Sequence, residues 1–323
     1  MGLSQLSSLT FSGNKITHIL DGTFDGLPEL EILDLTQNRI TAINLTTFSG
    51  LGQLDILMLQ GNQIVTIVPG SFATTSILRE LYLNQNNIVE IKPNTFKGLS
   101  ELELLNISSN GITYLPEGVF NGLIKLKELR LDGNRISTIN LTTFSDLTQL
   151  VYLSLKSNEI STIFPGSFAN AGHLRTLRLS HNKIVEITPN TFEGLSQLIL
   201  LNMSHNEIID VPRLAFNGLP SLRELFLEGN RITEINWNMF SGLRLLTVLN
   251  LRKNEISTIE PGSFASLVNL RTLWLADNKM KELKPRTFQG LTNLKFLHLF
   301  PAHSLVVQLN TFSDLPTSVK IMM

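Results

Sequence analysis

One asparagine recurs at every twenty-fourth position along almost the whole chain, from Asn14 to Asn278 without a gap. A phenylalanine series with the same spacing runs from Phe24 to Phe312, and two leucine series accompany them. Self-similarity at a fixed period of roughly 20–50 residues is the signature of a repeat architecture. The 323 residues are therefore predicted to form one array of about thirteen repeats, which argues against two unrelated globular domains.

Each repeat has the pattern L-x-x-L-x-L-x-x-N-x-I-x-x-I, and one copy consists of Leu78, Leu81, Leu83, Asn86, Ile88 and Ile91. In a short strand, alternation turns Leu81 and Leu83 inward and leaves Tyr82 facing outward. One strand cannot bury its leucines alone, but stacked copies form a parallel sheet over a continuous apolar core. The asparagine is predicted to satisfy backbone groups of its own turn and the next, and the phenylalanines are predicted to stack as a spine.

This pattern resembles the leucine-rich repeat over essentially the full chain. Repeats of this length with N-T-F or G-x-F before G-L, as in residues 93–99, resemble the extracellular animal subclass. That subclass includes Toll-like receptor ectodomains, variable lymphocyte receptors and matrix leucine-rich proteoglycans. The resemblance implies an α/β repeat solenoid: a right-handed leucine-rich repeat horseshoe, with a parallel sheet on the concave face and irregular or 3₁₀ segments on the convex side.

The chain contains no cysteine, which excludes disulfides, thiol catalysis and the common zinc frameworks. Members of the resembled subclass usually close each end with a cysteine-bonded cap. Here the chain begins inside a repeat and ends in a truncated strand at Ile321 to Met323. We therefore expect a repeat core of a longer protein, whose uncapped ends allow self-association; a capless intracellular array is the other interpretation.

Localisation and partner class follow from composition and sequons. Lys plus Arg number 26 against 27 Asp plus Glu, so the chain lacks the basic surplus expected for binding nucleic acid or anionic lipid. No apolar stretch approaches the roughly 18 residues that a membrane span needs, and no signal peptide is visible. Four glycosylation sequons, together with the resemblance, favour an extracellular or cell-surface protein; they are Asn44, Asn106, Asn140 and Asn202.

Catalytic motifs are not found in the sequence: it has no phosphate-binding glycine loop, no nucleophile elbow and no H-E-x-x-H. His181 and His205 occupy the same position in consecutive repeats, but a metal site needs more ligands than two. We therefore predict no enzyme activity, no cofactor and no metal, and interpret the histidines as exposed polar residues beside the sheet.

Outward-facing strand positions are where the repeats differ, and aromatic and arginine side chains at such positions dominate protein interfaces. The predicted ligand-binding residues are Tyr82, Arg178, Phe226, Arg252, Arg271 and Trp274. Phe226 and Trp274 lie two repeats apart, with Arg252 in the repeat between them. The alternative is that these are isolated surface aromatics, which are common and carry no function.

Charge is distributed unevenly over the five variable positions of each strand region. Repeats one to six carry seven acids and three bases there, whereas repeats seven to thirteen carry three acids and eight bases. The difference can steer an acidic partner to the second half of the array, or it can be an ordinary solvated surface.

The function that these observations favour is non-enzymatic recognition of a protein partner on the concave face, with an innate-immune receptor ectodomain among the roles that the resemblance suggests. The alternative is a structural, adhesion or matrix module that uses its lateral or convex surfaces. An enzyme is a distant third, because the sequence offers no site for it.

Overall fold

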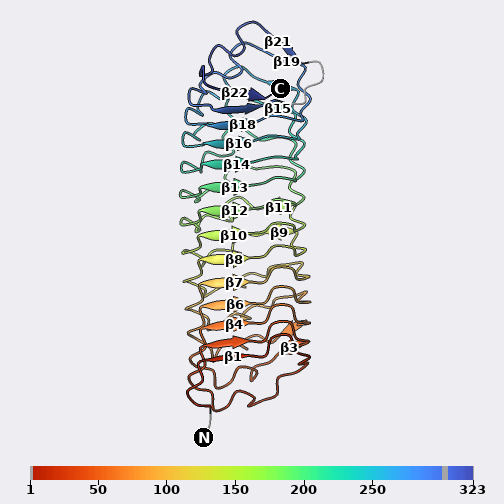
Figure 1. Ribbon diagram of the computed structural model, residues 1–323, viewed down its shortest axis with the longest axis vertical. Coiled ribbons are helices and arrows are strands. Elements are labelled where there is room, and N and C mark those ends of the chain that lie inside the picture. The colour runs from red at the N-terminus through yellow and green to blue at the C-terminus, as the bar shows by residue number, and fades with distance from the viewer. Residues whose placement is uncertain (1–2, 300–304, 323) are drawn as a thin grey trace. The chain divides into compact units, whose positions relative to one another are not determined.

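The computed structural model describes residues 3–299 and 305–322, so Met323 of the predicted terminal strand lies outside them. The chain is a solenoid of about thirteen turns, each about 24 residues long, with a short strand on one side and consecutive turns on the other (Figure 1). No helix occurs within the described ranges. The residues pack as two compact blocks: 1–160 with 170–172 (the N-terminal block), and 161–169 with 173–323 (the C-terminal block).

The N-terminal block contains seven parallel strands, each paired with the next along the chain. They are β1 (Ser8–Thr10), β2 (Ile32–Asp34), β4 (Ile56–Met58), β6 (Glu80–Tyr82), β7 (Leu104–Asn106), β8 (Glu128–Arg130) and β10 (Tyr152–Ser154). Two-residue strands lie on the return path of some turns: β3 (Ala42–Ile43), which pairs with β5 (Thr66–Ile67), and β9 (Thr138–Ile139).

The C-terminal block repeats this arrangement with seven further strands. They are β12 (Thr176–Arg178), β13 (Leu200–Asn202), β14 (Glu224–Phe226), β16 (Val248–Asn250), β18 (Thr272–Trp274), β20 (Phe296–His298) and β22 (Lys320–Met322). Its short return strands are β11 (Thr162–Ile163), β15 (Glu234–Ile235) paired with β17 (Thr258–Ile259), and β19 (Glu282–Leu283) paired with β21 (Val306–Val307).

The core of each block forms from the leucines that the period predicted to point inward. Leu57 aligns with Leu33 on one side and with Leu81 on the other, and all three side chains are fully buried. Because the register follows the sequence period, each leucine stacks on its equivalent in the neighbouring turn. The sheet therefore has one apolar face inside the block and one variable face outside, which we call the outer face.

The asparagine ladder is buried in most turns, with Asn14 exposed and Asn110 and Asn278 half-buried. Asn62 Nδ2 donates to the carbonyl oxygens of Leu35 (2.9 Å) and Leu59 (3.0 Å), and its Oδ1 accepts from the Ile40 N–H (3.0 Å). Leu59 belongs to the same turn, whereas Leu35 and Ile40 belong to the preceding turn. The predicted role of the asparagine is confirmed, but its second set of partners lies in the preceding turn rather than the next one.

The phenylalanine spine forms the core of the turn side. The ring of Phe96 stacks on those of Phe72 (6.4 Å between centroids) and Phe120 (6.2 Å), and all three are essentially unexposed. The segment around it consists of consecutive turns closed by bonds such as Thr95 N–H to Lys92 O (3.2 Å). Short i→i+3 bonds let the chain reverse direction tightly, so no regular helix is needed to cover the rings.

Candidate protein-binding face

The outer face of the C-terminal block carries most of the residues that the sequence predicted to bind a partner. The strand register aligns Phe226 with Asn250, Asn250 with Trp274, and Trp274 with His298. These four side chains therefore form one row across β14, β16, β18 and β20. Phe226 and Trp274 are both half-buried, so each is partly packed and partly available.

Trp274 and His298 form an aromatic stack on neighbouring strands, with ring centroids 5.4 Å apart and planes inclined by 25°. Burial lowers the pKa of His298, and the positive charge of Arg252 lowers it further. The imidazole is therefore neutral at neutral pH, which suits stacking on an indole. On the strand of His298, Phe296 is 38% exposed, although it was not among the residues predicted to bind a partner.

Arg252 is less available than the sequence indicated. Its Nε donates to Asp277 Oδ2 at 2.8 Å, and the neighbouring Lys253 Nζ lies 3.7 Å from Glu228 Oε1. Asn250 Oδ1 also accepts the backbone N–H of Arg252 at 3.0 Å. Two of the eight bases counted at the variable positions of repeats seven to thirteen are thus neutralised by acids in adjacent repeats.

A different set of bases remains exposed at the start of the strands. Arg223, Arg271 and Lys295 occupy the same repeat position, and within the described part of the chain none of them forms an ion pair. Lys295 N–H donates to Arg271 O at 2.8 Å, which fixes the two residues side by side. We call the following set the aromatic–basic patch: Phe226, Trp274, Phe296, His298, Arg223, Arg271 and Lys295. Arg178, also predicted to bind, is exposed on β12.

The sixth predicted residue, Tyr82, belongs to the N-terminal block, whose outer face is different in character. Its hydroxyl donates to Glu80 Oε2 at 2.7 Å on the same strand. Burial, with the hydrogen bond to the Glu80 carboxylate and the negative charge of that group, raises the pKa of Tyr82 to about 12. Tyr82 is therefore a neutral, half-buried donor among carboxylates.

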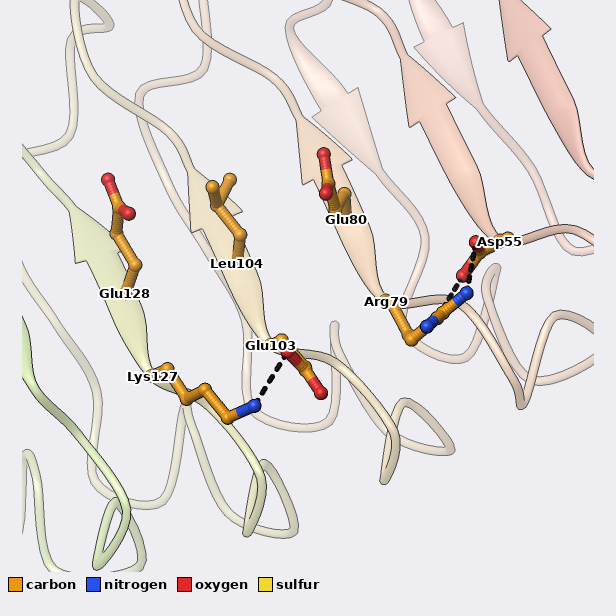
Figure 2. Close-up of a pocket in the computed structure, with 7 residues that line it drawn as sticks. All are labelled: Asp55, Arg79, Glu80, Glu103, Leu104, Lys127 and Glu128. Carbon is orange, nitrogen blue, oxygen red and sulfur yellow. Dashed lines mark hydrogen bonds and ion pairs between the residues drawn. The ribbon is translucent and has the colours of Figure 1, made fainter.

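A shallow cavity of about 340 Å³ opens beside Tyr82 on this face. Arg79 donates to both carboxylate oxygens of Asp55 (2.5 and 2.6 Å), and Lys127 reaches Glu103 (2.8 Å), as Figure 2 shows. Leu104 lies between Glu80 and Glu128 in the row next to these ion pairs (Figure 2). The cavity lining is polar, and two of its four carboxylates are paired with bases of the lining. It therefore has the chemistry of a surface groove and not of an enclosed ligand pocket.

The four sequons fall on two sides of the repeat. Asn44 and Asn140 directly follow the short return strands β3 and β9, on the turn side, and Asn44 is exposed. Asn106 and Asn202 occupy outward positions of β7 and β13. Asn106 is only 9% exposed, and its Oδ1 accepts from both the N–H (3.1 Å) and the hydroxyl (2.7 Å) of Ser108. The side chain of Asn44 is thus more accessible than that of Asn106.

His181 and His205 stack on each other, with centroids 4.5 Å apart, and both are exposed. Gly229 takes the same position in the next repeat, where a Cβ would lie 2.5 Å from His205 Nδ1, so glycine leaves room for the ring. Among the described residues no group of three or more His, Cys, Asp or Glu side chains is placed to hold a metal ion.

The turn side of the C-terminal block holds the chain's other tryptophan, Trp237, which was not among the residues predicted to bind a partner. Trp237 is 54% exposed, and the Arg213 guanidinium lies 5.2 Å from its ring centroid. Both residues occupy a position that is proline in several other repeats. That departure from the repeat pattern was the available signal.

No described segment is a helix that could cross a membrane. The sequence matches the family described as leucine rich repeat over residues 1–40, 28–88, 76–136, 124–184, 172–232, 225–280 and 245–301. Among curated proteins, none matches the sequence.

Solved structures with the same fold come from animals and bacteria. The Toll chain of a Drosophila Toll–Spatzle complex aligns with a TM-score of 0.78 and 22% identity, over 95% of this chain and 46% of that one. A leucine-rich repeat protein of Leptospira interrogans aligns with a TM-score of 0.74 and 26% identity, over 99% and 85%. TLR13 in complex with ssRNA13 aligns with a TM-score of 0.59 and 24% identity, over 92% and 63%. The chain thus spans less than two thirds of the Toll and TLR13 chains, and by its repeats and its fold it belongs to the leucine-rich repeat family.

Proposed function

We propose that this chain is a non-enzymatic recognition module that binds a protein partner through the aromatic–basic patch of its C-terminal block. The observation that carries the proposal is the row formed by Phe226 and the stacked pair Trp274 and His298, beside the unpaired bases Arg271 and Lys295. Partly packed aromatics next to arginine are the composition of interface hot spots. Proteins of this family are typically protein-interaction modules, which agrees with this role.

The partner that fits this surface is a protein with an acidic contact region. Four bases at the strand starts of the C-terminal block have no ion pair in the described chain: Arg175, Arg223, Arg271 and Lys295. The Toll structure is a complex with the protein Spatzle, whereas the TLR13 structure is a complex with ssRNA. We favour protein because the whole chain carries a net charge of -1, and a chain that binds through phosphates gains affinity from a basic surplus.

An extracellular or cell-surface location completes the proposal, with an innate-immune ectodomain as one such role. Its support is the family resemblance and the two turn-side sequons at Asn44 and Asn140. The second candidate is an adhesion or scaffold module that binds through the turn side. The exposed stack of Trp237 on Arg213 is the observation that favours it.

The two tryptophans make a matched test of these candidates. Wild type, Trp274→Ala and Trp237→Ala would be probed against an array of purified secreted and cell-surface proteins, with single-stranded RNA as a further probe. We expect protein binders that Trp237→Ala retains and that Trp274→Ala weakens about thirtyfold, because truncating a true interface anchor costs about 2 kcal/mol. Both substitutions should leave the melting temperature nearly unchanged, since neither side chain is in the core.

Binders that are lost with Trp237→Ala and kept with Trp274→Ala would replace the proposal by the turn-side candidate. Specific binding of the RNA probe, lost with Arg223→Glu and Arg271→Glu, would replace the protein partner by nucleic acid.

A further inference from the structure

The outer face of the N-terminal block has a surplus of carboxylates that no base neutralises. Among its described outward positions, the acids without an ion pair are Glu31, Asp34, Glu80 and Asp132. Asp34 accepts from the Thr10 hydroxyl (3.2 Å) and Glu80 from that of Tyr82 (2.7 Å), so the hydrogen-bond partner of each carboxylate is a hydroxyl and not a base. Lys156 is the one base outside an ion pair among these described positions.

The outer face of the C-terminal block has the opposite surplus, of bases over acids. Its exposed bases without an ion pair are Arg175, Arg223, Arg271, Lys295 and Lys320, and Glu224 is the one acid outside an ion pair among the described outward positions. The other charges on both faces cancel locally, as Arg79 does with Asp55 and Arg252 with Asp277. What remains is a surplus of opposite sign on two sheet faces of the same chain.

Apolar side chains accompany the surplus charge on both faces. Met58 and Leu104 are half-buried in the N-terminal block, and Phe226 and Trp274 are half-buried in the C-terminal block. Each face contains seven strands, which extend about 30 Å at the usual strand spacing. Two surfaces that each carry apolar side chains, and whose surplus charges are of opposite sign, can select and orient each other as partners.

We propose that the outer face of the N-terminal block of one copy docks on the aromatic–basic patch of a second copy. If the N-terminal face of each copy docks on the patch of the other, the pair is a closed dimer. If only one of these two contacts forms, the free face and the free patch can bind further copies, and an open chain results. The inference rests on the proposed function, because the second copy is then an acidic protein partner for the same patch. Self-association would cover the patch and compete with any other partner.

The test measures molar mass by sedimentation equilibrium of the whole chain at low and high salt. The wild type should associate at low salt and dissociate at high salt, because surface charges are screened beyond about 8 Å at physiological ionic strength. Glu31→Lys with Glu80→Lys should weaken association about tenfold or more, and so should Arg223→Glu with Arg271→Glu. The fourfold variant that combines both reversals restores complementarity and should associate again.

Lys97→Glu with Glu193→Lys, both exposed on the turn side, is the matched control and should associate like the wild type. Melting curves establish that each variant is folded. A wild type that stays monomeric at low salt, association indifferent to salt and charge reversal, or a fourfold variant that fails to associate would each overturn the inference.

The proposed function can fail separately. The double variant Glu31→Lys with Glu80→Lys leaves the aromatic–basic patch intact. It should therefore still bind those purified secreted or cell-surface proteins that Trp274→Ala no longer binds. If self-association is absent while those binders persist, only the inference fails; if the chain self-associates but Trp274→Ala loses no array binder, only the proposed function fails.

Discussion

At the scale of single residues, the asparagine ladder shows how one side chain makes a repeat possible. A carboxamide has donors and an acceptor on one planar group, so Asn62 can satisfy two carbonyls and one N–H that the tight turn leaves unpaired. An aspartate would lack the donors and a leucine would lack both functions. This explains why the position does not vary from Asn14 to Asn278 while the outward positions do.

Asn62→Ala should lower the free energy of unfolding by about 1–3 kcal/mol, because buried backbone groups lose their partners. The matched control is Asn87→Ala at an exposed position of the next repeat, where a change within about 0.5 kcal/mol is expected. Denaturant unfolding of both variants measures the difference. Equal shifts would contradict the structural role of the ladder.

The pKa of Tyr82, raised to about 12, predicts a specific alkaline behaviour. The folded pKa exceeds that of an unfolded tyrosine, which is about 10. The contribution of protonated Tyr82 to the free energy of unfolding is therefore fully present below about pH 10 and is lost as the pH rises through about 12. Phenolate absorbance should show one tyrosine titrating late, and Glu80→Gln should lower its pKa by removing a carboxylate. A late titration that is unchanged in Glu80→Gln would contradict the contribution of the Glu80 carboxylate to the pKa of Tyr82.

At the scale of elements, most turn segments share one backbone conformation although their side chains differ. One turn position has a left-handed backbone in most repeats, and its residues include Gly70 (φ 85), Asn94 (φ 64), Asn190 (φ 65) and Leu214 (φ 63). Glycine and asparagine tolerate this conformation, whereas leucine is strained there. Leu214 is also 51% exposed, so burial of its side chain does not offset the strain.

Leu214→Asn should therefore raise the free energy of unfolding by about 0.5–1 kcal/mol, since left-handed geometry costs an ordinary residue roughly 1–2 kcal/mol. Leu141→Asn is the control, because Leu141 is a similarly exposed leucine of a turn segment whose φ is not positive. Thermal unfolding of the two variants separates relief of strain from a general effect of replacing an exposed leucine. A gain shared by both would contradict the strain argument.

At the scale of the whole molecule, the solenoid presents an outer sheet face and a turn side that can serve different purposes. The aromatic–basic patch lies on the sheet face, while the exposed sequon Asn44 and the half-buried sequon Asn140 lie on the turn side. Glycans at Asn44 and Asn140 would leave the sheet face open to a large partner, whereas a glycan at Asn106 would stand on it.

Secretion from a glycosylating host followed by mass spectrometry should find glycans at Asn44 and Asn140 and none at Asn106. The physical reason is that Asn106 is 9% exposed and engaged by Ser108. A Ser108→Ala variant would remove the sequon itself, so the wild-type peptide map is the measurement. Full occupancy at Asn106 would contradict the packing of β7.

The repeat period by itself determined the strand positions, the inward leucines, the asparagine ladder and the phenylalanine spine. It could do so because the same residues bury the core and pair the backbone groups in each repeat, and the constant spacing stacks each repeat on its neighbour. Trp274 and the arginines of the strand regions could be assigned to outward positions in the same way. Trp237 was missed because it lies on the turn side, where it departs from the repeat pattern.

Only the tertiary structure decided which of those outward residues are available. Arg252 and Asp277 are 25 residues apart in sequence, yet they neutralise each other across adjacent repeats at 2.8 Å, while Arg271 stays unpaired within the described chain. Trp274 and His298 are similarly distant in sequence, but their stack depends on the rotamers that the neighbouring strand permits. Period and composition place side chains on a face, whereas ion pairing and stacking depend on side-chain reach across strands about 5 Å apart, which only the folded chain brings together.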